Sequence, residues 1–72
     1  MKESRHERFE RLACARGTRV IREIRLIGNL SNTKNYQYTD EDVEALFSAI
    51  EDELAACKRL FRDGGAVRLR RD

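Results

Sequence analysis

Proline and tryptophan are absent from this chain of 72 residues, which has only four glycines, two cysteines and one histidine. Proline and glycine are the residues that interrupt helices, so their scarcity permits long ones. One histidine and two cysteines cannot supply the four ligands of a structural zinc site, and a single cysteine pair is not the framework of a small secreted domain. We therefore expect no bound metal ion, no cofactor and no disulfide bond that stabilises the fold.

Long apolar runs are also missing. No stretch approaches the roughly 18 apolar residues that a membrane-spanning helix needs. The N-terminal sequence MKESRHERFERL is too charged for a secretory signal. We therefore expect a soluble, cytoplasmic protein that keeps its thiols reduced and makes no membrane contact.

Charged residues make up 39% of the chain and aromatic residues only 7%, a composition typical of long amphipathic helices rather than of sheets. The clearer of two such helices follows Thr39, whose side chain can cap it together with Asp42, and it ends before Gly64 and Gly65. Its apolar residues recur at spacings of three and four, and so share one side of a helix: Val43, Leu46, Phe47, Ile50, Leu54, Cys57, Leu60 and Phe61.

The other helix is expected from about Ser4 to Ile27, with Gly28 and Asn29 ending it in the left-handed conformation. Its apolar stripe consists of Phe9, Ala13, Val20, Ile24 and Ile27. Gly17 falls in this stripe, either as a hinge or because a bulky partner residue approaches it closely.

The two helices predict an all-α fold, a helical hairpin over residues 1–65 followed by a basic, disordered tail at 66–72. Two helices cannot cover each other's apolar faces on all sides. We therefore expect a homodimer, in which two hairpins form an antiparallel four-helix bundle. The facing levels of one hairpin are Ile27 with Val43, Ile24 with Phe47, Val20 with Ile50, Gly17 with Leu54, and Phe9 with Phe61.

The stretch between the helices, GNLSNTKNYQYTDED, is rich in small amide and hydroxyl side chains and is longer than most helix connections. One interpretation is structural, because asparagine and serine side chains hydrogen-bond the backbone in turns. The other is a recognition loop for an unknown protein partner, formed by Asn32, Lys34, Asn35 and Tyr36.

The net charge of +2 conceals three segments of alternating sign. Residues 1–27 carry eight basic and four acidic side chains, residues 40–57 carry seven acidic and no basic ones, and residues 58–72 carry six basic and two acidic ones. The candidate nucleic-acid contacts lie roughly opposite the apolar stripe of the first helix: Arg8, Arg11, Arg19 and Arg22. They can follow phosphates; alternatively, they face solvent or pair with acids of the second helix. No aromatic residue is interleaved with them to stack on bases.

Other chemistry has little support. His6 has no second ligand or nucleophile at a helical spacing, and no catalytic set of residues is recognisable, so we do not expect an enzyme. Cys14 and Cys57 can meet if the helices fold back on each other, but Cys57 is better explained as a small buried apolar residue.

The segment IRLIGNLSNTKNYQYTDEDVEALFSAIEDELAACKRLF, about half the chain, resembles a part of small bacterial proteins associated with conjugative and other mobile genetic elements. The resemblance implies a helix, an asparagine-rich turn and a second helix ending in CKRLF, and it implies no activity. The sequence leaves two functions open. One is an oligomerising protein-interaction or accessory module of a mobile element. The other is a nucleic-acid-binding accessory or regulatory protein that contacts phosphates through the arginines.

Overall fold

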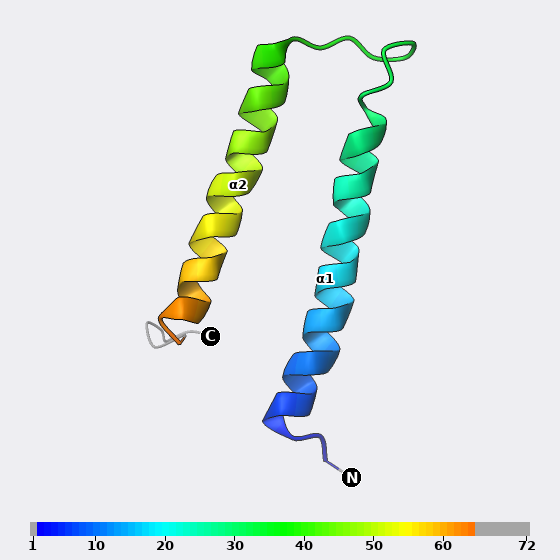
Figure 1. Ribbon diagram of the computed structural model, residues 1–72. Helices are drawn as coiled ribbons and strands as arrows, with labels where there is room; N and C mark the ends of the chain where they lie inside the picture. The colour runs from blue at the N-terminus through cyan, green and yellow to red at the C-terminus, as the bar shows by residue number, and fades with distance from the viewer. Residues whose placement is uncertain (1, 65–72) are drawn as a thin grey trace. The chain divides into compact units, whose positions relative to one another are not determined.

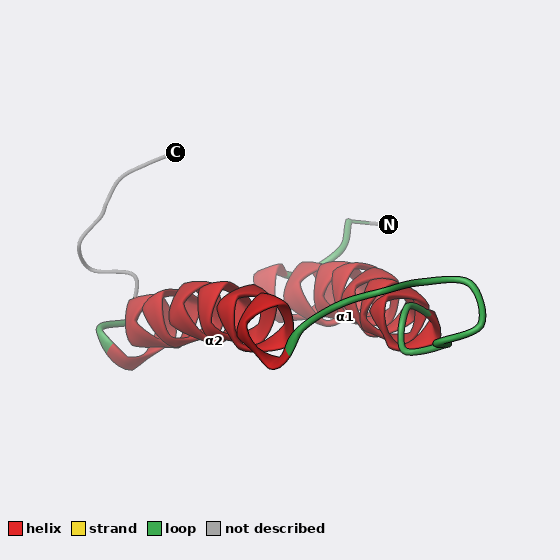
Figure 2. Cartoon of the chain, turned by 90° about the horizontal axis from the view of Figure 1, so that it is seen from above, coloured by secondary structure: helices red, strands yellow, loops and turns green. Residues whose placement is uncertain are grey.

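The structure, a computed structural model, describes residues 2–64 (Figure 1). Helix α1 spans Arg5–Asn29 and helix α2 spans Asp40–Arg62. Residues 30–39 form the loop that joins them (Figure 2), and residues 2–64 contain no strand. The predicted all-α fold, two long helices joined by a loop, is confirmed. The tail predicted at 66–72 lies outside the described residues.

The chain divides into two units, one with α1 and the first part of the loop, the other with α2. Each unit is defined by its own helix and its own caps. The facing levels within a hairpin and the four-helix bundle stay predictions.

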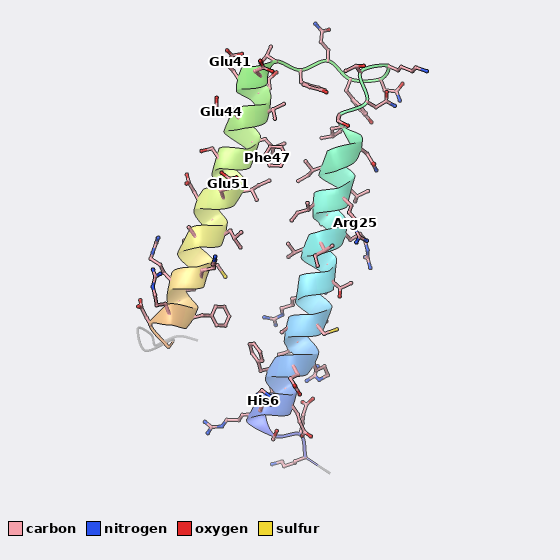
Figure 3. The ribbon with its side chains drawn as sticks, in the orientation of Figure 1. His6, Arg25, Glu41, Glu44, Phe47 and Glu51 are labelled. Atoms are coloured by element: carbon pink, nitrogen blue, oxygen red, sulfur yellow. The ribbon has the colours of Figure 1, made fainter. Side chains whose placement is uncertain are left out.

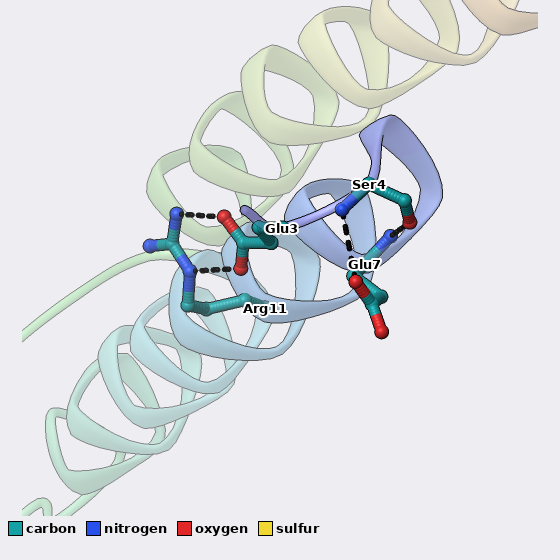
Figure 4. Close-up of polar contacts among 4 residues, drawn as sticks. All are labelled: Glu3, Ser4, Glu7 and Arg11. Atoms are coloured by element: carbon teal, nitrogen blue, oxygen red, sulfur yellow. Dashed lines mark hydrogen bonds and ion pairs between the residues drawn. The ribbon is translucent and has the colours of Figure 1, made fainter. Parts of the chain in front are cut away.

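Helix α1 begins where the sequence predicts, and a capping box fixes its first turn. The backbone N–H of Glu7 donates to Oγ of Ser4 at 3.0 Å, and the backbone N–H of Ser4 donates to Oε1 of Glu7 at 2.9 Å (Figure 4). The first four N–H groups of a helix have no partner within it, and a reciprocal box of this kind satisfies one of them. It also holds the residue before the helix in place. The helix then continues through Gly17 without a break, so no hinge is seen there.

The end of α1 differs from the prediction. Gly28 and Asn29 are helical, and the cap is Leu30 in an ordinary right-handed conformation, with φ −70° and ψ −9°. Leu30 and the two residues after it donate backbone hydrogen bonds three residues back, at 2.9, 3.1 and 3.3 Å. Such a tightened last turn satisfies the terminal carbonyls without a left-handed residue, which is why the prediction from Gly28 and Asn29 was wrong.

Both ends of α2 are confirmed. The backbone N–H of Asp42 donates to Oγ1 of Thr39 at 3.0 Å, and the N–H of Thr39 donates to Oδ2 of Asp42 at 2.9 Å. Asp40 and Glu41 add negative charge to the first turn, where the helix dipole is positive. At the other end Gly64 has a φ of 68°, a left-handed conformation that glycine adopts without strain, and its N–H bonds the carbonyl of Phe61 at 2.9 Å.

Candidate interaction surfaces

A regular apolar seam runs along α2. Six of its apolar residues alternate spacings of four and three over the whole helix, and we call them the α2 stripe: Val43, Phe47, Ile50, Leu54, Cys57 and Phe61. This is the spacing of core positions in coiled coils and four-helix bundles, where each side chain inserts between side chains of a neighbouring helix. The other two predicted apolar residues, Leu46 and Leu60, flank the seam on one side.

Four of the six residues of the α2 stripe are exposed, and Val43 and Ile50 are half-buried. No residue among 2–64 is buried, and the exposed fraction is 43% for Phe47, 57% for Leu54 and 68% for Phe61. Cys57 is also exposed and its thiol is free, so the prediction of a buried Cys57 is not met within the described chain. A run of large apolar side chains facing water on one side of a helix is typical of a surface that binds a partner.

The apolar stripe of α1 is less regular and equally open. Phe9, Val20 and Ile24 are 53%, 56% and 47% exposed, and Ile27 is half-buried. Gly17 interrupts the stripe near the middle of the helix. The two helices therefore each present an apolar side, and that of α2 has the more periodic spacing.

The four candidate nucleic-acid contacts are all exposed, and they fall into two groups. Arg11 donates from Nε and Nη2 to the two carboxylate oxygens of Glu3, at 2.8 and 3.0 Å (Figure 4). Within residues 2–64, Arg8, Arg19 and Arg22 form no ion pair. The four arginines were predicted as one set, and the ion pair of Arg11 with Glu3 was not predicted. The ion-pair partner, Glu3, lies before the helix and eight residues away, outside any helical spacing.

The hydrogen bonds from Arg11 lower the pKa of the Glu3 carboxyl, and the same contact raises the pKa of Arg11. A carboxyl whose pKa is lowered on folding stabilises the folded state above its unfolded pKa. This contribution is lost as the pH falls through the lowered folded value. Since both side chains are at the surface, the pair adds little to stability.

His6 is placed beside an acid rather than alone. Its Nε2 lies 3.4 Å from Oε2 of Glu10, one helical turn away, and its ring stacks on Phe9 with centroids 6.4 Å apart. Among residues 2–64 there is no group of three or more His, Cys, Asp or Glu side chains that could hold a metal ion.

The charged side chains of α2 have no ion-pair partner within the part of the chain that the structure describes. Glu44 and Glu51 lie beside the α2 stripe, and they are labelled together with Phe47 in Figure 3. Each follows a stripe residue directly in the sequence, and Lys58 continues the same row one heptad later. From the sequence, the acids of this helix are candidate partners for the arginines of the first helix, and the row that they form with Lys58 was not predicted.

The loop between the helices is organised by Asn32. Its Oδ1 accepts from the backbone N–H of Lys34 at 3.0 Å, and its carbonyl accepts from Asn35 and Tyr36 at 3.1 and 3.0 Å. Asn32 thus has the structural role of the first interpretation. The side chains of Lys34, Asn35 and Tyr36 are exposed, with 48% of Tyr36 open to solvent, and the recognition interpretation stays a prediction for all four residues.

Comparisons of the chain with protein-family models, with curated proteins and with solved structures find no match. Within the described residues, neither helix is long and apolar enough to cross a membrane.

Proposed function

We propose that this protein is a self-associating helical module, a homodimer that serves as an accessory protein. The observation that carries the proposal is the α2 stripe, a seam of core-type spacing along the helix in which no side chain is buried and Phe47, Leu54 and Phe61 are exposed. The resemblance to mobile-element proteins supports an accessory role in such an element, and it stays a prediction.

A helix of the length of α2 needs this seam to be covered. Helices in proteins owe most of their stability to packing of an apolar face rather than to the helix propensity of their residues. Burying a stripe side chain such as Phe47 or Leu54 stabilises by about 2 kcal/mol. Caps and dipole charges at Thr39, Asp40 and Asp42 contribute less. Association through the apolar faces therefore supplies the larger part of the stabilisation.

Within such an assembly the loop is the candidate contact for a further protein partner. Asn32 holds the turn, and the exposed side chains of Lys34, Asn35 and Tyr36 project from it. An amide, a cation and a phenol on one hydrogen-bonded turn suit recognition of a polar surface by hydrogen bonds and aromatic contact.

Self-association makes stability depend on protein concentration. We expect the midpoint of thermal unfolding, followed by circular dichroism, to rise with each tenfold increase in concentration above about 2 µM. For a dimer each tenfold step adds about 1.4 kcal/mol, which shifts the midpoint by roughly 3–6 °C for two chains of this size. A midpoint that is the same across two such steps would show that the folded unit is a monomer.

Nucleic-acid binding is the second candidate function, and one observation favours it. Arg8, Arg19 and Arg22 are exposed, carry no acidic partner among residues 2–64, and point away from the centre of the apolar stripe of α1. A row of arginines along a helix can follow phosphates without reading bases.

Replacing Arg8, Arg19 and Arg22 by Gln tests this second function. If the wild type retards duplex DNA in a mobility-shift assay, the triple variant should lose most of the affinity, and the log–log salt slope should fall in magnitude by about 0.9 for each phosphate contact removed. Lys34→Gln with Arg59→Gln is the control, since it removes positive charge outside α1. Absence of a shift for the wild type at low salt would exclude the second function and leave the first.

A further inference from the structure

The charged row beside the α2 stripe has a polarity along the helix. Glu44, Glu51 and Lys58 are seven residues apart and lie on the same edge of the stripe. One turn beyond each end, Asp40 and Arg62 lie within about 40° of this row around the helix. In chain order the row reads acid, acid, acid, base, base, and none of these side chains has an ion-pair partner within residues 2–64.

We propose that the α2 stripe binds the α2 stripe of a second copy, with the two helices antiparallel. This inference rests on the proposed self-association and specifies its geometry. It replaces the facing levels predicted from the sequence, in which the same residues of α2 face α1 of their own chain. Reversal of one helix places the acidic end of each row against the basic end of the other. Glu44 then faces Lys58 of the second copy, and Asp40 faces Arg62 of the second copy. The two-fold symmetry forms each pair twice, so four ion pairs flank the seam.

The stripe fits the same register. With the centre of the contact midway between Ile50 and Leu54, each of these two residues faces the other in the second copy. Phe47 then faces Cys57, a large side chain against a small one. At the ends Phe61 faces Val43. Pairing large with small side chains at successive levels is how packed helices fill a core without voids.

A parallel arrangement is disfavoured by the same residues. It places Phe47 against Phe47 and Cys57 against Cys57. It also gathers both copies of the acidic half, with seven acids between residues 40 and 57 in each, at one end of the pair. The helix dipoles would be aligned as well. Antiparallel pairing avoids all three features.

Two like-charge contacts remain at the centre, one on each edge of the stripe. Glu51 lies close to the two-fold axis and meets Glu51 of the second copy, so this contact weakens the dimer. Glu53 lies about 160° around the helix from Glu51, on the opposite edge of the stripe, where it meets Glu53 of the second copy. Glu51→Gln is therefore expected to tighten association, although it removes charge from the surface.

Charge reversal tests the pairing. Glu44→Lys and Lys58→Glu each replace two attractive contacts by two repulsive ones, and each should weaken dimerisation roughly five- to thirtyfold at low salt. The double variant restores opposite charges in the antiparallel geometry and should return the dissociation constant to within about threefold of the wild type. Asp52→Lys and Arg59→Glu are matched controls, because they reverse charges on the far side of α2 and should have little effect.

A cross-link tests the orientation independently. In a background of Cys14→Ser and Cys57→Ser, copies with Glu44→Cys are mixed with copies with Lys58→Cys and oxidised with copper–phenanthroline. The antiparallel pair should give a mixed disulfide dimer, whereas either copy alone should give none. With the native cysteines, Cys57 and Cys57 of the second copy lie about ten residues apart along the seam, or ~15 Å, too far for a disulfide.

The outcomes distinguish a failure of the antiparallel pairing from a failure of self-association. A dimer that forms a Cys57 to Cys57 disulfide, or one in which the charge-reversed double variant stays as weak as the singles, overturns the antiparallel pairing and leaves self-association standing. A wild type that remains monomeric overturns both. Recovery in the double variant together with the mixed cross-link supports both.

Discussion

Ile50→Glu is expected to abolish self-association and with it most of the helical signal. Ile50 is half-buried in the described chain and lies at the centre of the α2 stripe. A carboxylate placed there would have to be buried without a partner in each of the two copies. Each burial costs several kcal/mol, so the dissociation constant should rise by more than a thousandfold. Sedimentation velocity and circular dichroism at 222 nm, at about 50 µM protein, measure both effects.

Ser48→Glu is the matched control. It adds the same charge two residues away, at an exposed position on the opposite side of α2. The control should keep the mass and the helicity of the wild type. If Ile50→Glu behaves like Ser48→Glu, the α2 stripe faces water in solution and is not an interface.

Phe47→Ala should weaken association strongly while leaving the helix itself intact in the remaining dimer. Phe47 is 43% exposed in the described chain, and covering it removes a large aromatic surface from water. Truncating a packed phenylalanine costs about 3 kcal/mol or more, which corresponds to at least a hundredfold increase in the dissociation constant. A dilution series followed by circular dichroism gives this constant for wild type and variant.

Tyr36→Ala removes an aromatic ring of similar size and similar exposure, 48%, from the loop. Because the loop is outside the proposed interface, this variant should associate like the wild type. Equal weakening by Phe47→Ala and Tyr36→Ala would instead indicate that the loop is part of the self-association surface, and it would contradict the assignment of the interface to the stripe.

The ends of a helix could be predicted from the sequence where the interactions that determine them are local. Thr39 and Asp42 form the predicted capping box, and Gly64 takes the left-handed conformation that ends α2, because each depends only on neighbours within a few residues. The end of α1 was harder to predict. Gly28 can adopt either a helical or a left-handed conformation. It stays helical because the backbone hydrogen bonds of a tightened last turn already satisfy the terminal carbonyl groups of α1.

The candidate surfaces also include features that the sequence predicted and features that it did not predict. The α2 stripe follows from spacing alone, and four of its six residues are exposed in the described chain. The pairing of Arg11 with Glu3 could not be predicted, since it depends on how the residues before α1 turn back along the helix. The Ser4 and Glu7 capping box had a readable signal, a serine followed three residues later by glutamate, that the sequence analysis overlooked.

The two proposed functions also differ in which helix carries them. Self-association depends on the apolar seam of α2, whereas phosphate binding depends on three arginines of α1. Both can operate in one protein, because a dimer that doubles a basic face also doubles the number of phosphate contacts, and affinity rises steeply with that number. The stripe variants and the arginine variants therefore separate assembly from binding.

Sedimentation equilibrium of the wild-type chain tests the central claim most directly. At concentrations from about 5 to about 100 µM, we expect a folded species with twice the chain mass of 8.4 kDa, in equilibrium with monomer at the lower end. A helical species that stays at 8.4 kDa throughout this range would contradict self-association and every interface described above.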